Sequence, residues 1–270
     1  MKKVSLLFLF AMVLGVLAAC SGSQEEDPTT DDASSAEDVL AKVQEEGTLV
    51  IGTEGTYPPF TFHDASGELT GFDVEIAREV ASRLGVEAEF LETQWDAMFA
   101  GLDAGRFDMV ANQVGINPER QESYEFSDPY ITSTAVLVVA EDNTEIKSFE
   151  DLKGKLSAQS LTSNYGATAT SFGAELEGVE GFNQAIELLN SGRVDATVND
   201  NLTVLDFMKQ RPEAKVKVVD KSEDAAQSAL LFRKGSGALV DEANKALADM
   251  IEDGTYDEIS AKWFGENVLK

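Results

Sequence analysis

The sequence has 270 residues and is poor in the side chains that catalytic and metal sites use most. Cys20 is its single cysteine and His63 its single histidine. One cysteine excludes an intramolecular disulfide and any cysteine-rich metal site. The sequence also lacks the motifs of a serine nucleophile elbow, a dinucleotide-binding loop and a phosphate-cradling loop. We therefore expect no catalytic residues, no metal and no cofactor.

Two other features could suggest such chemistry, and neither does so strongly. His63 stands beside Asp64 in a stretch typical of an exposed hairpin, which does not favour a role in acid–base catalysis. The acidic pairs Asp31-Asp32 and Glu45-Glu46 have neither clustered histidines nor the spacing of a calcium loop. We interpret these pairs as solvated surface charge.

Basic residues are scarce. The 21 Lys and Arg residues stand against 49 Asp and Glu residues, which gives a formal net charge of −28 at pH 7. Because nucleic acid is bound by basic surfaces, this acidity excludes a nucleic-acid partner, and it disfavours broad contact with anionic lipid. Solubility in a salty exterior is one interpretation of the charge, and a composition without mechanistic meaning is the other. The electric field of this net charge would steer a zwitterion only weakly, because a zwitterion has no net charge.

The apolar run from Val4 to Ala19 follows Lys2 and Lys3. It is shorter than the roughly 20 residues that span a bilayer, so it predicts a signal peptide over residues 1–19. Leu17-Ala18-Ala19-Cys20 resembles a lipobox, which predicts that Cys20 is lipidated and anchors the protein to a membrane. The alternative is a soluble secreted protein with an incidental cysteine. Cleavage before Cys20 would remove both lysines and bring the formal charge to −30.

Residues 20–46 are predicted to form the lipidated cysteine and a disordered acidic tether. The stretch from Ser21 to about Asp38 has no apolar periodicity and is rich in acidic residues, Ser and Thr. A flexible coil of that length spans roughly 25 Å. The tether would let a folded domain stand off from its membrane.

The rest of the chain alternates short β-like runs, such as Thr48 to Thr53, with helical runs, such as Trp95 to Ala104. Such alternation predicts an α/β fold with mostly parallel sheets. Near the end, Lys215 to Val219 and Ala229 to Arg233 are predicted as two separate strands. The ordered part could form one large domain or two small ones, and its two successive β/α blocks favour two lobes.

Gly52 to Gly85 is the most informative stretch. A β-rich run ends in Tyr57-Pro58-Pro59, a glycine-containing hairpin follows, and a helix with one apolar face begins at Phe72. Proline holds the backbone extended, so aromatic and acidic groups are presented at the carboxyl end of a strand. Ligands of open α/β sheets bind at that end.

The pattern G-F-D-V-E-I-x-x-x-V-A-x-x-L that begins at Gly71 resembles the signature of bacterial solute-binding proteins that deliver polar amino acids to ABC importers. The closing segment, which ends in Lys262-Trp263-Phe264-Gly265, resembles the same family. The resemblance covers residues 47–267. It implies a two-lobed, type II periplasmic-binding-protein fold in which each lobe is a mostly parallel sheet flanked by helices. Lobe 1 would span 47–137, lobe 2 138–228, and residues 229–270 would return to lobe 1, with hinge crossings near 136–140 and 227–232.

A free amino acid needs donors for its carboxylate and an acceptor for its ammonium group, because unpaired buried charges are costly. By the resemblance, Arg120 binds the carboxylate, and its planar fork suits that role. Asp200 would bind the ammonium from the opposite lobe, so that the lobes close on the ligand. From the residues alone, Arg120 reads as a surface residue and Asp200 as a helix cap.

The other expected ligand contacts come from both lobes. By the resemblance, Glu54 and Tyr57 contact the ligand, and Trp95 forms an apolar wall, although an aromatic residue at a helix start is more often core. Phe62 and Tyr165 are weaker candidates, and Tyr130 is assigned to packing. The loops near the carboxylate would contribute Asn112, Gln113, Gly115, Thr162, Ser163 and Asn164. For Ser163 and Asn164, simple N-capping is the alternative.

The segments TEGTYPPFTFHD, NQVGINPER and SLTSNYG are most similar to receptors for cystine or related sulfur amino acids. The sequence does not rank cystine against cysteine, glutamine or a diamino acid. The resemblance implies a monomer that works with ABC permease subunits on the extracytoplasmic face of a membrane, or in a periplasm. The alternatives are a dehydratase of prephenate-like acids on the same fold and a sensory lipoprotein.

Overall fold

The computed structural model describes the backbone of residues 34–269 and the side chains of residues 39–269. The predicted signal peptide, Cys20 and the first part of the predicted tether lie outside these residues. Within the described part of the chain, no helix is both long enough and apolar enough to cross a membrane.

The first described element corrects the tether prediction. Residues Ser34–Glu46 form helix α1, so the prediction of disorder up to residue 46 is wrong for this part. Val43 is completely buried in the core, and Val39 and Leu40 pack against the same core. These residues lie on one face of a helix, and burying that face stabilises α1 against β1 and α8 (Gly237–Asp253).

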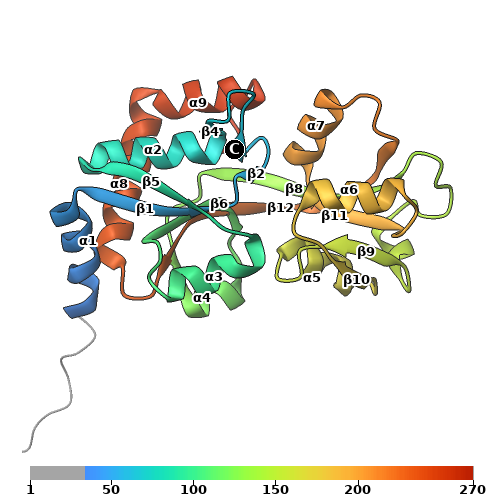
Figure 1. Ribbon diagram of the computed structural model, residues 1–270, viewed down its shortest axis with the longest axis horizontal. Coiled ribbons are helices and arrows are strands. Elements are labelled where there is room, and N and C mark those ends of the chain that lie inside the picture. The colour runs from blue at the N-terminus through green and yellow to red at the C-terminus, as the bar shows by residue number, and fades with distance from the viewer. Residues whose placement is uncertain (1–33, 270) are drawn as a thin grey trace, which may run out of the picture. The chain divides into compact units, whose positions relative to one another are not determined.

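Lobe 1 is built on three parallel strands. Strand β1 (Thr48–Thr53) lies between β5 (Glu87–Glu92) and β6 (Met109–Gly115). Helices α2 (Phe72–Leu84), α8 and α9 (Thr255–Phe264) cover one face, and α3 (Trp95–Asp103) covers the other (Figure 1). All seven residues of β6 are buried because both faces of the sheet are covered.

Alternating side chains of β1 reach both cores. Leu49 and Ile51 lie in the core under α2 and α8, while Val50 packs on the α3 side. The elements that complete lobe 1 are a small antiparallel sheet and a short helix with its following strand: β2 (Thr56–Tyr57), β3 (Thr61–His63), β4 (Leu69–Thr70), α4 (Pro118–Ser123) and β7 (Tyr124–Phe126).

Lobe 2 repeats this layered arrangement around β9 (Leu156–Gln159), which lies between β10 (Glu175–Gly178) and β11 (Ala196–Asp200) in parallel register. Its two faces carry separate apolar clusters, one under α5 and one under α6 and α7. The remaining elements are the short 3-10 helix Phe149–Leu152, α5 (Asn164–Ser171), α6 (Phe182–Asn190) and α7 (Asn201–Gln210).

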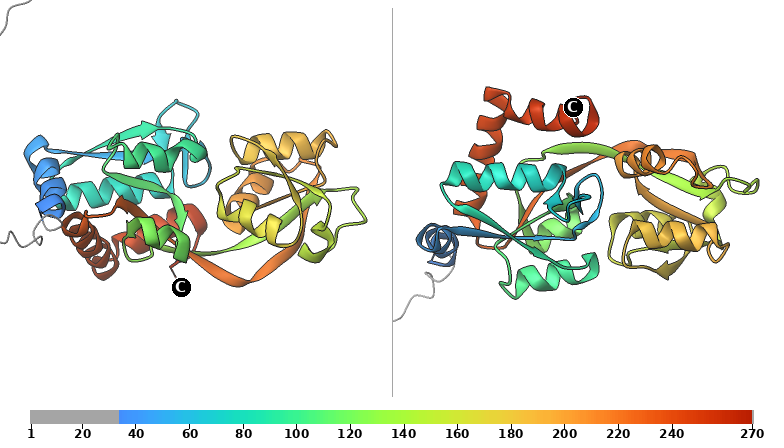
Figure 2. Two further views of the ribbon diagram at one scale, coloured as in Figure 1. Left: turned by 90° about the horizontal axis from the view of Figure 1, so that it is seen from below. Right: turned by 45° about the horizontal axis from the view of Figure 1, so that its top comes forward.

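Two long antiparallel strands connect the lobes, β8 (Ile131–Ala140) and β12 (Val216–Arg233) (Figure 2). The predicted pair of short strands is in fact this one strand of 18 residues. Between Lys221 and Ala225 the pairing register against β8 shifts, so that four steps along β12 match two along β8. The α/β, two-lobed prediction is confirmed, and the antiparallel pairing is confined to the strands that cross between lobes and to short edge elements.

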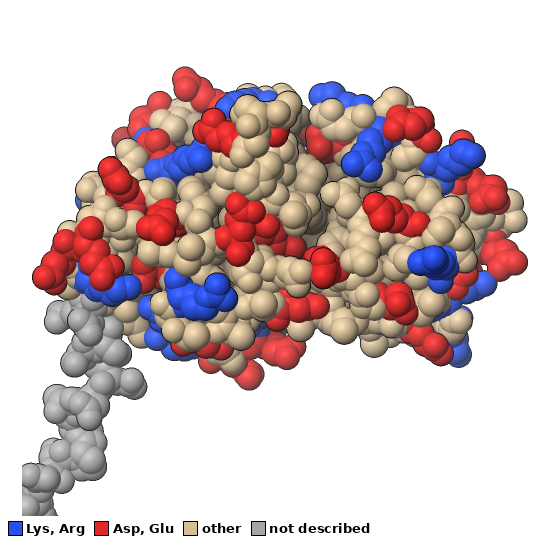
Figure 3. Space-filling model, viewed as in Figure 1, with Lys and Arg blue, Asp and Glu red and all other residues tan. Residues whose placement is uncertain are grey.

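The surface is acidic over both lobes. On the face shown in Figure 3, Asp and Glu side chains are spread widely, with Lys and Arg side chains between them. Acidic charge is therefore distributed over this face, as a role in solubility would require.

Candidate ligand-binding site

A cavity lies between the two lobes. The empty space between its walls, including the part open to solvent, is about 510 Å³. Lobe 1 contributes Glu54, Tyr57, Trp95, Asn112 and Gln113 to its lining. Lobe 2 contributes Ala158, Gln159, Ser160, Ser163, Asn164, Tyr165, Val179, Gly181, Phe182, Ala185, Thr197 and Asn199.

Glu54 follows the last residue of β1, as the sequence predicts. Its backbone N–H donates to Asn112 Oδ1 at 2.8 Å, and Asn112 Nδ2 donates to Glu54 Oε2 at 2.6 Å. The hydroxyl of Thr53 donates to the carbonyl oxygen of Ala111 at 3.0 Å, which ties the ends of β1 and β6 together. Burial raises the pKa of the Glu54 carboxyl to about 7, although Asn112 acts against this rise. The site therefore holds a carboxyl group that changes charge near neutral pH.

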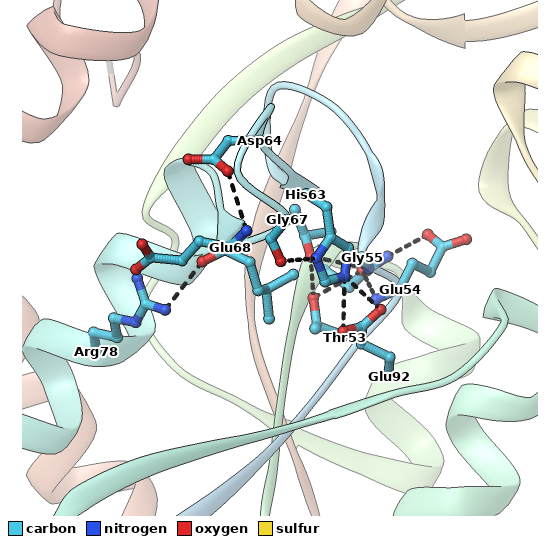
Figure 4. A network of polar contacts seen from close by, with 12 residues as sticks. Thr53, Glu54, Gly55, His63, Asp64, Gly67, Glu68, Arg78 and Glu92 are labelled. Carbon is cyan, nitrogen blue, oxygen red and sulfur yellow. Dashed lines mark hydrogen bonds and ion pairs between the residues drawn. The ribbon is translucent and has the colours of Figure 1, made fainter.

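The hairpin after β1 is fixed by a polar network on its outer side (Figure 4). His63 Nε2 lies 2.9 Å from Glu92 Oε1, and His63 Nδ1 lies 3.0 Å from the carbonyl oxygen of Gly67. The contact with Glu92 is the main cause that raises the pKa of His63. Gly55 has a φ of +69° and packs so closely on the Glu92 side chain that a Cβ would overlap it. His63 does not line the cavity, and its contacts anchor the hairpin beside Glu54.

Gln113 adopts a left-handed backbone conformation with a φ of +52°, which is uncommon for a residue with a side chain. The completely buried Asp73 accepts from Gln113 N at 2.6 Å and from Gln113 Nε2 at 3.0 Å. Burial raises the pKa of Asp73 to about 7. The Asp in the G-F-D-V motif thus holds a lining residue of the cavity in a strained conformation.

Arg120 lies in helix α4, which begins at Pro118 and is capped by Asn117, whose Oδ1 accepts from Arg120 N at 2.8 Å. Its guanidinium carbon lies 5.3 Å from the ring centre of Trp95 and 5.2 Å from that of Phe99. The side chain is only 8% exposed, and burial lowers the pKa of the guanidinium. Among the described residues, no carboxylate lies within ion-pair distance of it. The structure therefore contradicts the surface interpretation of Arg120.

The guanidinium of Arg120 donates to two backbone carbonyls. Nη1 donates to Gly115 at 2.9 Å and Nη2 to Thr162, in lobe 2, at 3.2 Å. A Cβ on Gly115 would lie 3.6 Å from the Asn164 amide group and 3.7 Å from Arg120 Nη1. The structure thus brings four predicted residues together where the lobes meet, although only Asn164 among them lines the cavity.

Asp200 is the N-cap of α7, so the capping interpretation is confirmed: its Oδ1 accepts from Leu202 N at 2.7 Å. Ser133 Oγ donates to the same oxygen at 2.9 Å, and the hydroxyl of Tyr165 donates to Oδ2 at 3.0 Å. Asp200 is 3% exposed, and burial raises the pKa of its carboxyl. In the part of the chain that the structure describes, no Lys or Arg pairs with it. Asp200 lies behind Tyr165, which lines the cavity.

The residues of the loop before α5 have different roles. Ser163 caps the helix, accepting from Gly166 N at 3.0 Å, which confirms the capping alternative, and it also lines the cavity with Asn164. Thr162 is exposed and does not line the cavity. Its backbone N–H and its hydroxyl donate instead to Asp96 Oδ1 of lobe 1, at 3.1 and 2.7 Å.

The aromatic residues considered as ligand contacts differ in whether they line the cavity. Trp95 is both core and cavity wall, since it is 7% exposed, packs with the α3 cluster and lines the cavity. Tyr165 also lines the cavity, whereas Phe62 packs on Trp263 and does not. Tyr130 is buried in the core, as predicted.

Sequence reasoning missed most of the lobe 2 lining. Gln159 ends β9 and Asn199 lies near the end of β11, and neither belongs to a recognisable motif. The available signal was positional, because both lie at the carboxyl ends of parallel strands. Among the described residues, no group of three or more His, Cys, Asp or Glu side chains could hold a metal ion.

The raised pKa of Glu54 predicts a pH-dependent effect of Glu54→Gln on stability. The unfolded chain releases this proton near pH 4.5, while the folded protein keeps it up to about pH 7. The carboxyl's contribution is complete below pH 4.5 and is lost as pH rises through 7. We expect the variant to gain up to about 3 kcal/mol of unfolding free energy at pH 8 and almost nothing at pH 4.

Denaturant unfolding at both pH values measures this effect. The exposed Glu89 of β5 supplies the control, Glu89→Gln, which should change little at either pH. An equal gain at pH 4 and pH 8, or a loss at pH 8, would show that burial does not hold the Glu54 proton.

Comparison with known proteins gives the family of this chain. The sequence matches the family described as "Bacterial extracellular solute-binding proteins, family 3" over residues 49–266. It is 51% identical over 271 residues to the L-cystine-binding protein TcyA of Bacillus subtilis, an alignment that covers 100% of both chains.

Two solved structures extend this likeness. An ancestral arginine-binding protein bound to arginine is 41% identical, with a TM-score of 0.77 over 81% of this chain and 99% of the other. The unliganded, open L-cystine solute receptor of Neisseria gonorrhoeae is 47% identical, with a TM-score of 0.57 over 86% and 99%. The resemblance inferred from the sequence motifs is confirmed: this chain belongs to family 3 of the bacterial extracellular solute-binding proteins.

Proposed function

We propose that the protein is the extracytoplasmic receptor of an amino-acid ABC importer. It binds cystine, or a related sulfur amino acid, in the cavity between its lobes and delivers it to permease subunits. The protein itself makes and breaks no covalent bond in this cycle. It acts as a monomer, and the lipid on Cys20 holds it at the membrane, a proposal that rests on the lipobox alone.

The observation that carries this proposal is a pair of buried, opposite charges without counter-ions among the described residues. Arg120 is 8% exposed and Asp200 is 3% exposed, and they belong to different lobes. Each lies directly behind an aromatic residue that lines the cavity, Trp95 or Tyr165. A buried unpaired charge costs several kcal/mol. An amino-acid zwitterion offers a carboxylate to the one and an ammonium to the other.

Contacts between the lobes support binding by closure. The hydroxyl of Tyr57 donates to Asn199 Oδ1 across the cavity at 2.7 Å, and Arg120 donates to Thr162. The chain also superposes better on the arginine-bound relative than on the open receptor, although the open receptor is closer in sequence. Lobe closure predicts this order, since it changes the superposition of two-lobed proteins without changing either lobe.

The choice of cystine rests on the relatives and on the lining. The Bacillus subtilis and Neisseria gonorrhoeae proteins are both named for cystine. The described residues of the cavity lining include no Lys, Arg or His, so a side chain with a net negative charge would meet no counter-charge there, whereas the second amino-acid end of cystine is a zwitterion without net charge. Glu54, Gln159 and Asn199 instead offer polar groups to a second ammonium or to an uncharged end.

The rival functions have less support. A dehydratase would be a departure from the proteins reported above, all of which are named as binding proteins or receptors. The ionisable groups of the lining are one carboxyl and two phenols, Glu54, Tyr57 and Tyr165, and burial raises the pKa of both phenols. A sensory role would use the same cavity, and a pull-down of permease subunits against receptor kinases distinguishes it.

The proposal is tested by a thermal-shift screen of the twenty amino acids and cystine, followed by calorimetry. We expect cystine to give the largest shift and an affinity near micromolar, which corresponds to about −8 kcal/mol. Glutamate and a prephenate-like acid are the negative controls, with an assay for turnover of the latter. A protein indifferent to every free amino acid, or one that converts the acid, would overturn the proposal.

A further inference from the structure

Thr162 makes an unusual set of contacts for an exposed loop residue. Its N–H and its hydroxyl both donate to Asp96 Oδ1, at 3.1 and 2.7 Å, and its carbonyl oxygen accepts from Arg120 Nη2 at 3.2 Å. Every hydrogen-bonding group of this lobe 2 residue is therefore paired with lobe 1. Asp96 is exposed and is not part of the cavity lining.

Two hydrogen bonds close the turn that contains Thr162. Ser163 donates to the carbonyl oxygen of Ser160 through its N–H at 3.0 Å and through its hydroxyl at 2.7 Å. Ser163 also caps α5, and Asn164, the first residue of that helix, lines the cavity. A displacement of Thr162 would therefore also displace the start of α5 and the residues there that line the cavity.

The contact also affects Arg120. Its guanidinium lies against the rings of Trp95 and Phe99, and two of its N–H groups are directed at the carbonyls of Gly115 and Thr162. Those two acceptors fix the orientation of the planar guanidinium of Arg120. Its remaining N–H groups are the ones that can donate hydrogen bonds to a ligand carboxylate. Asp96 holds the second of these acceptors in place.

We propose that Asp96 is a positioning residue for ligand binding. Asp96 holds Thr162, and Thr162 in turn contacts Arg120, so these contacts join the two lobes across the mouth of the cavity. They orient the carboxylate-binding guanidinium of Arg120 and slow the opening of the lobes. This inference rests on the proposed function, because it assigns Asp96 to the same binding event. It adds a residue that touches no ligand and that the sequence did not single out.

The test compares ligand dissociation rates by stopped-flow tryptophan fluorescence, with L-cystine as the probe. Asp96→Ala removes both acceptor bonds to Thr162, so we expect dissociation to become about tenfold faster and association to change less than twofold. Asp96→Asn keeps an oxygen that accepts both bonds, so it should restore a rate close to that of the unaltered protein. This rescue separates positioning from a general effect of charge.

Asp103 at the other end of α3 gives the matched control. It carries the same charge and accepts from the hydroxyl of Tyr124 at 2.9 Å, entirely within lobe 1. Asp103→Ala should leave the dissociation rate unchanged. Equal dissociation rates for Asp96→Ala and the unaltered protein, or equal acceleration by Asp103→Ala, would overturn the proposal.

A second measurement does not depend on any ligand. The double variant Asp96→Cys with Thr162→Cys should form a disulfide between the lobes on mild oxidation, because the two residues meet across the cavity mouth. Asp103→Cys with Thr162→Cys should not. Failure of the first pair to cross-link would contradict the contact itself. Absence of all amino-acid binding together with successful cross-linking would instead contradict the proposed function alone.

Discussion

Replacing Arg120 by alanine is expected to abolish measurable amino-acid binding while leaving the protein folded. The substitution removes the one buried cation beside the cavity in the described part of the chain, so a bound carboxylate would lose its counter-charge. Removing one partner of a buried, hydrogen-bonded charge pair costs about 2 to 5 kcal/mol or more, which corresponds to roughly thirtyfold to several thousandfold in affinity. Isothermal titration calorimetry with L-cystine measures the loss.

Two further variants sharpen this experiment. Arg120→Lys keeps the charge but not the planar fork, so we expect an affinity between those of the unaltered protein and the alanine variant. Arg78 is an exposed arginine of lobe 1 that donates to the Leu69 carbonyl, and Arg78→Ala should bind normally. Near-native affinity in Arg120→Ala would show that the carboxylate is bound elsewhere.

Replacing Asp200 is expected to have an equally large effect on binding, through the ammonium. Asp200→Ala removes both the charge and the cap of α7, and loss of the cap alone costs about 1 kcal/mol of stability. Asp200→Asn separates the two roles, because asparagine is also a good N-cap but carries no charge. We expect the asparagine variant to be at least as stable as the unaltered protein and still unable to bind.

Calorimetry and denaturant unfolding of the same samples distinguish these outcomes. Ser148 caps the 3-10 helix at Phe149 through a reciprocal pair of bonds with Asp151, and Ser148→Ala serves as the control for loss of a cap. That variant should lose stability without losing affinity. If Asp200→Asn binds as tightly as the unaltered protein, Asp200 is a structural cap and the ammonium has another partner.

The local structure of lobe 1 could be predicted from the sequence because local signals and tertiary contacts agree there. The strand Thr48–Thr53 was predicted with its bounds, and the helix that begins at Trp95 differs from its prediction by one residue at the end. Both segments have apolar residues at the spacing of their own structure, and both bury them on the expected side.

Two other segments could not be predicted in this way. The middle of β12, Asp220 to Gln227, is polar and alanine-rich and has no strand signal, and it is extended because it pairs with β8. Helix α1 has its apolar face within an acidic segment whose composition indicated disorder. In both cases the stabilising partner is distant in the sequence.

The residues of the candidate site also differ in whether they could be predicted from the sequence. Glu54 and Arg120 could be proposed from motifs because each motif fixes a position relative to the end of a strand; Glu54 lines the cavity, whereas Arg120 lies beside it. Thr162 was assigned to the ligand from its place in a motif, whereas its side chain bonds to Asp96. Gln159 and Asn199 carry no motif and become visible only when β9 and β11 are placed side by side.

The shift of register between β8 and β12 has a mechanical consequence. Any rotation of one lobe against the other must bend the two strands that join them, and a regular ladder resists bending. Between Lys221 and Ala225, β12 has two residues more than β8 for the same length of ladder. This surplus of backbone would let β12 lengthen or shorten during a rotation while the pairs before and after it stay intact. We therefore expect a rotation between the lobes to bend the pair here and at the second register shift, between Val218 and Asp220.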